Sequence, residues 1–317
     1  MTAPHPPAGS LPEPRRALPR LGIGTAPLGG LFEEVTEREA AATLEAATAE
    51  GITLFDTAPR YGNGLAEERL GRLLPAGTAR PVISTKAGWL LREGAGSEPH
   101  WITDWTERGI RTSLEGSLER LGRSSVDVLY LHDPQDYADE VRATAYAAAC
   151  RLRDEGLVGA IGFGMNRLAA LTGFVSEFDV DVVLVAGHFS LLDHGALRTL
   201  LPLCRRTGTE VVVGGVFATG LLADPSRGAM YNYHPAPDEV LERARLCGRI
   251  CEEYGVPPAA AAVQFPFLHP AVDSVVLGCR TATEVTANAA ASRFPVPDEL
   301  WDRLAAAGFV PPGLLGR

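Results

Sequence analysis

Short apolar runs alternate with amphipathic stretches along most of this sequence. The runs are rich in Val, Ile and Leu, as buried parallel strands are. They occur at residues 20–24, 52–56, 82–85, 126–131, 159–163, 181–186, 210–214 and 274–277. The stretches between them repeat apolar residues at helical spacing, as in residues 37–50, 110–121, 139–154 and 196–206. Strands and helices that alternate in this way predict a parallel sheet, and eight such units predict a (β/α)8 TIM barrel of the α/β class.

Two long segments interrupt this alternation. Residues 87–105 follow the third strand and contain Gly and Trp, and residues 215–236 follow the seventh and contain Gly, Pro and Tyr. Loops that follow barrel strands lie on the catalytic face, where they form pocket walls or lids. Residues 237–254 and a short stretch after Pro297 have helical patterns. We therefore expect a barrel with extra C-terminal helices and long catalytic-face loops.

The length of 317 residues suits one barrel of about 250 residues with insertions. Neither a linker nor a shift in composition divides residues 20–317, which predicts a single domain. Residues 1–19 are rich in Pro and Ala and are expected to be a disordered tail. This tail lacks the apolar stretch of a signal peptide, and nothing in the chain approaches the roughly 20 apolar residues of a membrane span.

Charge and cysteine content narrow the class of protein. The formal net charge of -10 disfavours binding to nucleic acid or to acidic membrane surfaces. Five cysteines, without the paired spacing of a secreted scaffold, favour a reduced, cytoplasmic protein. Cys247 and Cys251 would share one helix face, but two thiols without further ligands make a poor zinc site, so no metal is expected.

Candidate chemistry lies at the ends of three successive strands. Asp56, Lys86 and His132 end these strands or follow them directly, and Tyr61 comes one short loop after Asp56. The carboxyl ends of barrel strands meet at one mouth. A nearby ammonium lowers the pKa of a tyrosine from about 10, and an aspartate would hold the lysine in place. Taken singly, each residue has an ordinary alternative: a turn or helix cap for Asp56, a solvated lysine and a loop histidine.

Together these four side chains suit proton transfer to or from an alcohol or carbonyl oxygen. They supply neither an evident nucleophile nor a set of metal ligands. A hydride would complete such a reaction, and because a protein cannot carry a hydride itself, a nicotinamide cofactor is expected.

Several motifs in order resemble those of the aldo-keto reductases. They are GITLFDTAPRYGNGLAEERLGRLL at 51–74, STK at 84–86, SLERLGRSSVDVLYLHDP at 117–134 and LRDEGLVGAIGFGMN at 152–166. The resemblance extends from about residue 20 to residue 292. It implies a (β/α)8 barrel that binds NAD(P) in an extended form, without a Rossmann domain. It also implies that Asp56, Tyr61, Lys86 and His132 are a catalytic tetrad, with Tyr61 the general acid in reduction and the general base in oxidation.

Four further segments are similar to the D-threo-aldose 1-dehydrogenase group, which includes L-fucose and D-galactose dehydrogenases. They are GFGMN at 162–166, VLVAGHFSLLDH at 183–194, GGVFATGLLA at 214–223 and AAVQFPFLHPAVDSVVLG at 261–278. This similarity implies NAD(P)-dependent oxidation of an aldose at C1 to the lactone. The alternatives are a carbonyl reductase of secondary metabolism, an enzyme like the pyridoxal 4-dehydrogenases, and a cofactor-sensing binding subunit like the potassium-channel β subunits.

The resemblance also implies how the cofactor is held. Asn166 would bind the nicotinamide carboxamide, the loop 215–222 would wrap the pyrophosphate, and Asn288 would contact the adenine. Glu284 stands where NADP-dependent relatives usually carry Arg, so NAD is favoured over NADP, although Arg280 could still hold a phosphate and Glu284 could be plain surface. The residues expected at the cofactor are Gly24, Thr25, Asp56, Met165, Asn166, Gly215, Val216, Phe217, Thr219, Gly220, Leu222, Gly278, Arg280, Glu284 and Asn288.

The expected partner is a small-molecule substrate, a sugar, alcohol or aldehyde, held by Trp89, His132 and His188. Trp89, Trp101 and Trp105 fall in the first long loop, and their aromatic faces suit a sugar or a flat ring, with core packing as the alternative. Trp89 and His188 stand where the sugar dehydrogenases often have Arg, which favours a less polar substrate than a free aldose. The sequence does not set the oligomeric state.

Overall fold

Eight parallel strands close into a barrel in the computed structural model, which describes residues 18–31, 33–92, 101–224, 230–231 and 234–316. The strands are β1 (Leu21–Gly24), β2 (Leu54–Asp56), β3 (Val82–Ala87), β6 (Val126–His132), β7 (Val158–Met165), β8 (Val182–Ala186), β9 (Glu210–Gly214) and β12 (Ser274–Gly278). They pair in sequence order, and β1 pairs with β12 to close the ring. All eight overlap the strands expected from the sequence, so the predicted fold class is confirmed.

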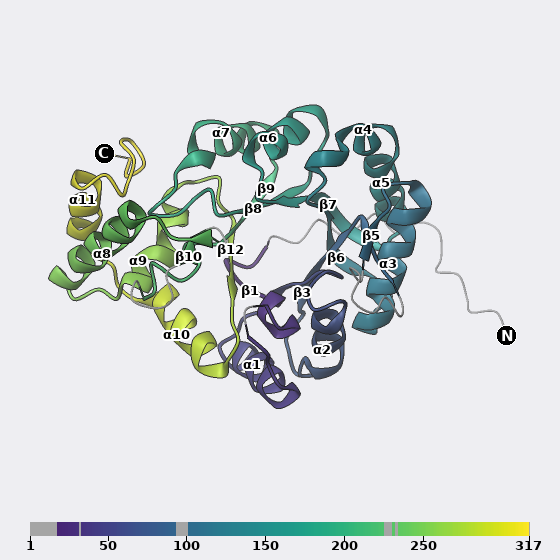
Figure 1. The fold of residues 1–317 in the computed structure, drawn as a ribbon, viewed down its shortest axis with the longest axis horizontal. Helices are drawn as coiled ribbons and strands as arrows, with labels where there is room; N and C mark the ends of the chain where they lie inside the picture. Colours follow the sequence, from purple (N-terminus) through teal and green to yellow (C-terminus); the bar gives the residue numbers. More distant parts are fainter. Residues whose placement is uncertain (1–17, 32, 93–100, 225–229, 232–233, 317) are drawn as a thin grey trace.

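A ring of helices surrounds the strands (Figure 1). Its members are α1 (Glu37–Ala49), α2 (Leu65–Leu73), α3 (Glu107–Leu121), α5 (Tyr146–Asp154), α6 (Leu168–Glu177), α7 (Leu200–Thr207), α9 (Pro258–Gln264) and α10 (Ala282–Arg293). The added helices are α8 (Asp238–Glu253) and α11 (Asp298–Ala306), which pack together on one side of the barrel (Figure 1). Shorter helical turns are η1 (Ala26–Gly29), η2 (Gln135–Tyr137), α4 (Ala138–Glu140), η3 (Val141–Ala145), η4 (Gly195–Arg198) and η5 (Phe265–Leu268).

The two long segments between barrel units contain short strands. In the first, β4 (Trp89–Leu91) pairs antiparallel with β5 (Trp101–Thr103), and in the second, β10 (Met230–Tyr231) pairs with β11 (His234–Pro235). Neither pair was expected, because runs of two or three residues are too short to show a period. Residues 93–100, 225–229 and 232–233 of these segments, and residues 1–17 of the expected tail, lie outside the described residues.

Side chains alternate between two cores along each strand. One core lies inside the barrel and contains Leu54, Val82, Val128, Tyr130, Ala160, Val182, Leu184, Val212 and Val276. The other, larger core lies between strands and helices and includes Phe55, Ile83, Leu129 and Ile161. Because successive strand residues face opposite sides, Asp56, two residues after Leu54, continues the inward row. Lys86 on β3 and His132 on β6 continue the inward rows of their own strands in the same way.

The described residues contain neither a membrane-spanning helix nor a cluster of metal ligands. No helix in those ranges is long and apolar enough to cross a bilayer. Nor do they contain a group of three or more His, Cys, Asp or Glu side chains that could hold a metal. Cys247 and Cys251 are both buried on α8, and the five cysteines, all described, are free thiols.

Candidate active site

A buried ion pair joins β2 to β3 at their carboxyl ends. The Lys86 ammonium lies 2.7 Å from Asp56 Oδ2, with 2% and 5% of the two side chains exposed. Lys86 also donates to the carbonyl oxygen of Thr57 at 2.8 Å, and Ser84 Oγ donates to Asp56 Oδ1 at 2.7 Å. Each charge therefore has several partners, as a buried pair needs to offset its desolvation.

The environment keeps Lys86 charged. Burial alone would lower its pKa, but the negative charges of Asp56 and Tyr61 outweigh burial and raise the pKa above its ordinary value. Since the interaction between two groups is mutual, the ammonium and the Tyr61 phenolate stabilise each other. The Lys86 nitrogen lies 4.6 Å from the centroid of the Tyr61 ring.

A tight turn between β2 and α2 carries Tyr61. Its backbone passes so close to η1 that a Cβ on Gly62 would lie 2.3 Å from the Gly29 carbonyl oxygen. Gly62 also has a φ of +63°, so glycine suits this position for two reasons. This close approach of the two backbones fixes the turn, and with it the half-buried tyrosine, beside Lys86.

His132 completes the group as a neutral imidazole. Burial, and then the positive charges of Lys86 and Arg60, lower its pKa well below the ordinary value of 6.5. Its ring meets that of Tyr61 edge-on, with centroids 6.0 Å apart. Among the described residues, Nδ1 is buried without a hydrogen-bond partner, and Nε2 lies 3.7 Å from Asp133 Oδ2. A neutral ring in this position can exchange a hydrogen bond with a substrate oxygen without changing charge.

The structure thus brings Asp56, Tyr61, Lys86 and His132 together at one end of the barrel. The arrangement pairs an acid–base phenol with an ammonium that favours its ionised form and with a neutral hydrogen-bonding ring. This set can move a proton to or from an oxygen atom.

The loop expected to hold the pyrophosphate has an unusual backbone near residue 218. Gly215, Ala218, Thr219 and Gly220 all have left-handed backbone, with φ of +73°, +49°, +59° and +96°. Two of them are not glycines, and such conformations are uncommon outside functional turns. The N–H groups of Ala218, Gly220, Leu221 and Leu222 donate to carbonyl oxygens within the same loop. That residues 215–222 wrap the pyrophosphate therefore stays a prediction.

The other residues expected at the cofactor lie at or after the carboxyl ends of three strands. Gly24 ends β1, and the buried Thr25 follows it and donates from Oγ1 to the Asp56 carbonyl oxygen at 3.1 Å. Met165 is buried at the end of β7, and the exposed Asn166 follows it. After β12, Gly278 is exposed, and Asn288 on α10 donates from Nδ2 to the sulfur of Cys279 at 3.2 Å.

Arg280 is bound by two carboxylates. Its guanidinium lies 2.6 Å from Glu284 Oε1 and 2.8 Å from Glu33 Oε2, and its backbone N–H donates to Glu284 Oε2 at 2.8 Å. Its charge is therefore already balanced within the protein. Glu33, on the loop between η1 and α1, was not singled out from the sequence, because an isolated surface glutamate has no distinguishing pattern.

The tryptophans divide between the core and the site. Trp105 is buried, with its ring packed on Gly88, so it takes the core role. Trp89 is half-buried, and its indole N–H donates to the His132 carbonyl oxygen at 2.8 Å.

His188, expected at the substrate, places Nε2 2.8 Å from the Asn166 carbonyl oxygen and Nδ1 3.5 Å from Asp193 Oδ2.

Comparison with known proteins identifies the family of this chain. The model of the aldo/keto reductase family matches residues 20–308. The chain belongs to this family. It is an NAD(P)-dependent oxidoreductase that acts on CH–OH groups, as the sequence predicted.

Among relatives of this aldo/keto reductase, the D-threo-aldose 1-dehydrogenase of a Pseudomonas species is 41% identical over 93% of this chain and 95% of its own. The pyridoxal 4-dehydrogenase of Microbacterium luteolum is 36% identical over 92% and 94%. The solved structure of an aldo-keto reductase from Bacillus halodurans, at 24% identity, covers 92% of each chain with a TM-score of 0.74 and supports the fold.

Arg60 and Asp133 also lie at this site, although the sequence analysis did not single them out. Arg60 precedes Tyr61 and Asp133 follows His132, so their place next to two tetrad residues in the sequence could have pointed to them.

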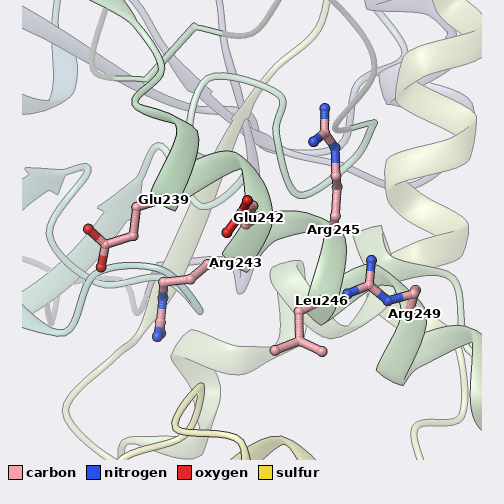
Figure 2. Close-up of a pocket in the computed structure, with 6 residues that line it drawn as sticks. All are labelled: Glu239, Glu242, Arg243, Arg245, Leu246 and Arg249. Carbon is pink, nitrogen blue, oxygen red and sulfur yellow. The ribbon is translucent and has the colours of Figure 1, made fainter.

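A separate hollow on the outer face of α8 is lined by Glu239, Glu242, Arg243, Arg245, Leu246 and Arg249 (Figure 2). In Figure 1, α8 lies across the barrel from β3 and β6, so this hollow is not part of the site.

Proposed function

We propose that this enzyme oxidises the C1 hydroxyl of an aldose to the lactone, with NAD as the preferred cofactor. The observation that carries the proposal is the cluster of Tyr61, Lys86 and His132 at the barrel mouth. The likeness to a D-threo-aldose 1-dehydrogenase over nearly the whole chain supports the choice of substrate.

In this mechanism Tyr61 takes the proton of the reacting hydroxyl. Lys86 favours the phenolate, and Asp56 holds Lys86 charged and in place through the 2.7 Å contact. The neutral His132 donates a hydrogen bond to the substrate oxygen or accepts one from it and so orients the substrate. A bound nicotinamide would accept the hydride from carbon.

The first test is Tyr61→Phe, which keeps the ring and removes the acid–base group. We expect turnover to fall by roughly 10²–10⁴-fold, the usual contribution of a general acid or base. The measurement is the rate of NADH formation with a panel of aldoses. Unchanged melting temperature and dinucleotide affinity would show that the variant is folded, and near-normal turnover would remove Tyr61 from the mechanism.

The cofactor preference rests on the two carboxylates around Arg280. A 2′-phosphate near this guanidinium would also approach Glu33 and Glu284, and placing like charges together costs free energy. A ribose hydroxyl could instead donate to Glu284.

We therefore expect kcat/KM for NAD to exceed that for NADP by about tenfold or more, equivalent to about 1.4 kcal/mol. Replacing Glu284 by Gln removes one charge while keeping the shape, and it should narrow this ratio. A wild-type enzyme that prefers NADP would contradict the proposal.

A second candidate substrate is a flat aromatic alcohol or aldehyde of the pyridoxal type. The likeness to the pyridoxal 4-dehydrogenase, 36% identical over 92% of this chain, favours it. Assaying pyridoxal and aromatic aldehydes beside the sugars, in both directions, separates the candidates and also tests a carbonyl reductase. Tight dinucleotide binding without turnover on this panel would instead point to a cofactor-sensing subunit.

A further inference from the structure

Arg60 has a fixed position at the mouth of the site. Its guanidinium carbon lies 4.1 Å from the centroid of the Trp89 ring and 5.2 Å from that of Trp101. Trp89 is itself held by its hydrogen bond to the His132 carbonyl oxygen. Stacking on an aromatic ring orients the plane of a guanidinium and leaves its N–H groups at the edge available to a ligand. Arg60 is close enough to the tetrad to lower the pKa of His132.

Asp133 lies beside this guanidinium. It follows His132 directly and has a φ of +50°, which is uncommon for a residue other than glycine. Its backbone N–H donates to the Gly164 carbonyl oxygen at 3.1 Å, which fixes the turn. Burial raises the pKa of its carboxyl group, while Arg60, Lys86 and Arg167 and a hydrogen bond from the Asn166 backbone oppose this rise.

The two side chains form a loose pair. Arg60 Nη1 and Asp133 Oδ2 are 3.6 Å apart, which is longer than a hydrogen bond, and the side chains are 30% and 28% exposed. A fork of donors and a pair of acceptors therefore stand side by side, accessible and close to Tyr61 and His132. The pair carries no net charge, so an anionic ligand would meet Asp133 and a cationic one would meet Arg60. A neutral ligand with a donor next to an acceptor satisfies both.

We propose that Arg60 and Asp133 determine substrate specificity by binding neighbouring hydroxyl groups of a neutral polyhydroxylated substrate while its reacting hydroxyl lies at Tyr61. One hydroxyl oxygen accepts from the guanidinium, and the adjacent hydroxyl donates to the carboxylate. This inference rests on the proposed oxidation of an aldose and names the residues that select it. It also revises the expectation of a less polar substrate. That expectation came from Trp89 and His188 standing in place of Arg, but Arg60 brings a guanidinium back to the site, on the face of Trp89.

The test measures discrimination between a sugar and its deoxy analogues. Wild-type enzyme is assayed with D-galactose and with its C2, C3 and C4 monodeoxy analogues. At two adjacent positions we expect kcat/KM to fall by about 10–100-fold on loss of the hydroxyl, because Arg60 or Asp133 is then left without its hydrogen bond. Arg60→Met keeps the aliphatic stem on Trp89, and Asp133→Asn suits the left-handed backbone. Each variant should lose most of the discrimination at one of the two positions and keep it at the other, mainly through a higher KM for D-galactose.

Arg38→Met provides the matched control, since it removes an exposed arginine from α1 and should leave the discrimination intact. Should Arg60→Met fail to fold, Arg60→Lys serves, because it keeps the charge and loses the planar fork. Variants that slow D-galactose and the deoxy sugars by the same factor would overturn the inference and give the pair a purely structural role. Wild-type enzyme that reduces simple aldehydes but oxidises no aldose would instead refute the proposed function on which the inference rests.

Discussion

At the scale of single residues, the chemistry of this site depends on how each group is surrounded. His132 and Lys86 are both buried and basic, yet burial lowers the pKa of His132 while Asp56 and Tyr61 raise that of Lys86. The difference lies in the neighbours. Lys86 contacts the Asp56 carboxylate at 2.7 Å, whereas His132 is buried close to the charges of Lys86 and Arg60, with the Asp133 carboxylate farther away at 3.7 Å. One group is therefore charged and the other neutral at neutral pH.

His132 should make the stability of the protein depend on pH. Unfolded histidine takes up a proton near pH 6.5, but the folded His132 does so only at much lower pH. Between these values the unfolded state binds more protons, so the free energy of unfolding falls as the pH is lowered. The contribution is complete above pH 6.5 and is lost below it, by at most about 1.4 kcal/mol per pH unit.

Urea unfolding of the wild type and of His132→Asn between pH 7.5 and 5 measures this contribution. The difference in stability between the two proteins should shrink as the pH falls. A constant difference would show that His132 titrates normally. His188 contributes with the opposite sign, because its contact with Asp193 raises its pKa, and it cancels in this comparison.

At the scale of elements, glycines decide how closely strands and helices can approach. A Cβ on Gly162 of β7 would lie 1.6 Å from the Val182 carbonyl oxygen of β8, so no side chain fits without moving a strand. Gly173 on α6 has nothing within 4 Å of a Cβ, and there alanine would only reduce the flexibility of the unfolded chain.

These two glycines make a matched pair for mutation. Gly162→Ala should destabilise the barrel by about 1–3 kcal/mol or prevent folding, because backbone cannot yield as a side chain can. Gly173→Ala should stabilise it by about 0.5–1 kcal/mol. Thermal and urea unfolding measure both, and a Gly162→Ala protein as stable as the wild type would mean that β7 and β8 are not packed as described.

The larger elements could be predicted from sequence because their patterns are long. The apolar runs that became β6 and β8 have the length and composition of buried strands, and α8 shows a helical period over 16 residues. The pairing of β4 with β5 could not be predicted in this way. Each of its two strands has only three residues, which is too few to show a period. The strands are also separated in the sequence, so nothing local indicates that they pair.

At the scale of the whole molecule, the site joins segments that are far apart in the chain. The residues expected to hold the dinucleotide come from the ends of β1, β7, β9 and β12, which meet only when the barrel closes. A ligand that bridges these ends binds the folded chain and not the unfolded one, so it stabilises the fold.

Dinucleotide binding should therefore raise the melting temperature. At a concentration 100 times its Kd, a ligand stabilises the folded state by about 2.7 kcal/mol. At equal concentrations we expect NAD to produce a larger shift than NADP, because Glu33 and Glu284 already neutralise Arg280. Differential scanning fluorimetry measures the two shifts, and an equal or larger shift with NADP would count against the preference.

The sequence by itself determined the class of fold and the four residues at the centre of the site. Strand and helix periods are local, and Asp56, Lys86 and His132 are marked by their place at strand ends. Only the tertiary structure decided that Arg60 lies on Trp89, that Asp133 faces this guanidinium, and that Glu33 reaches Arg280. These contacts join side chains from different loops, whose paths depend on the packing of the closed barrel and leave no periodic signal in the chain.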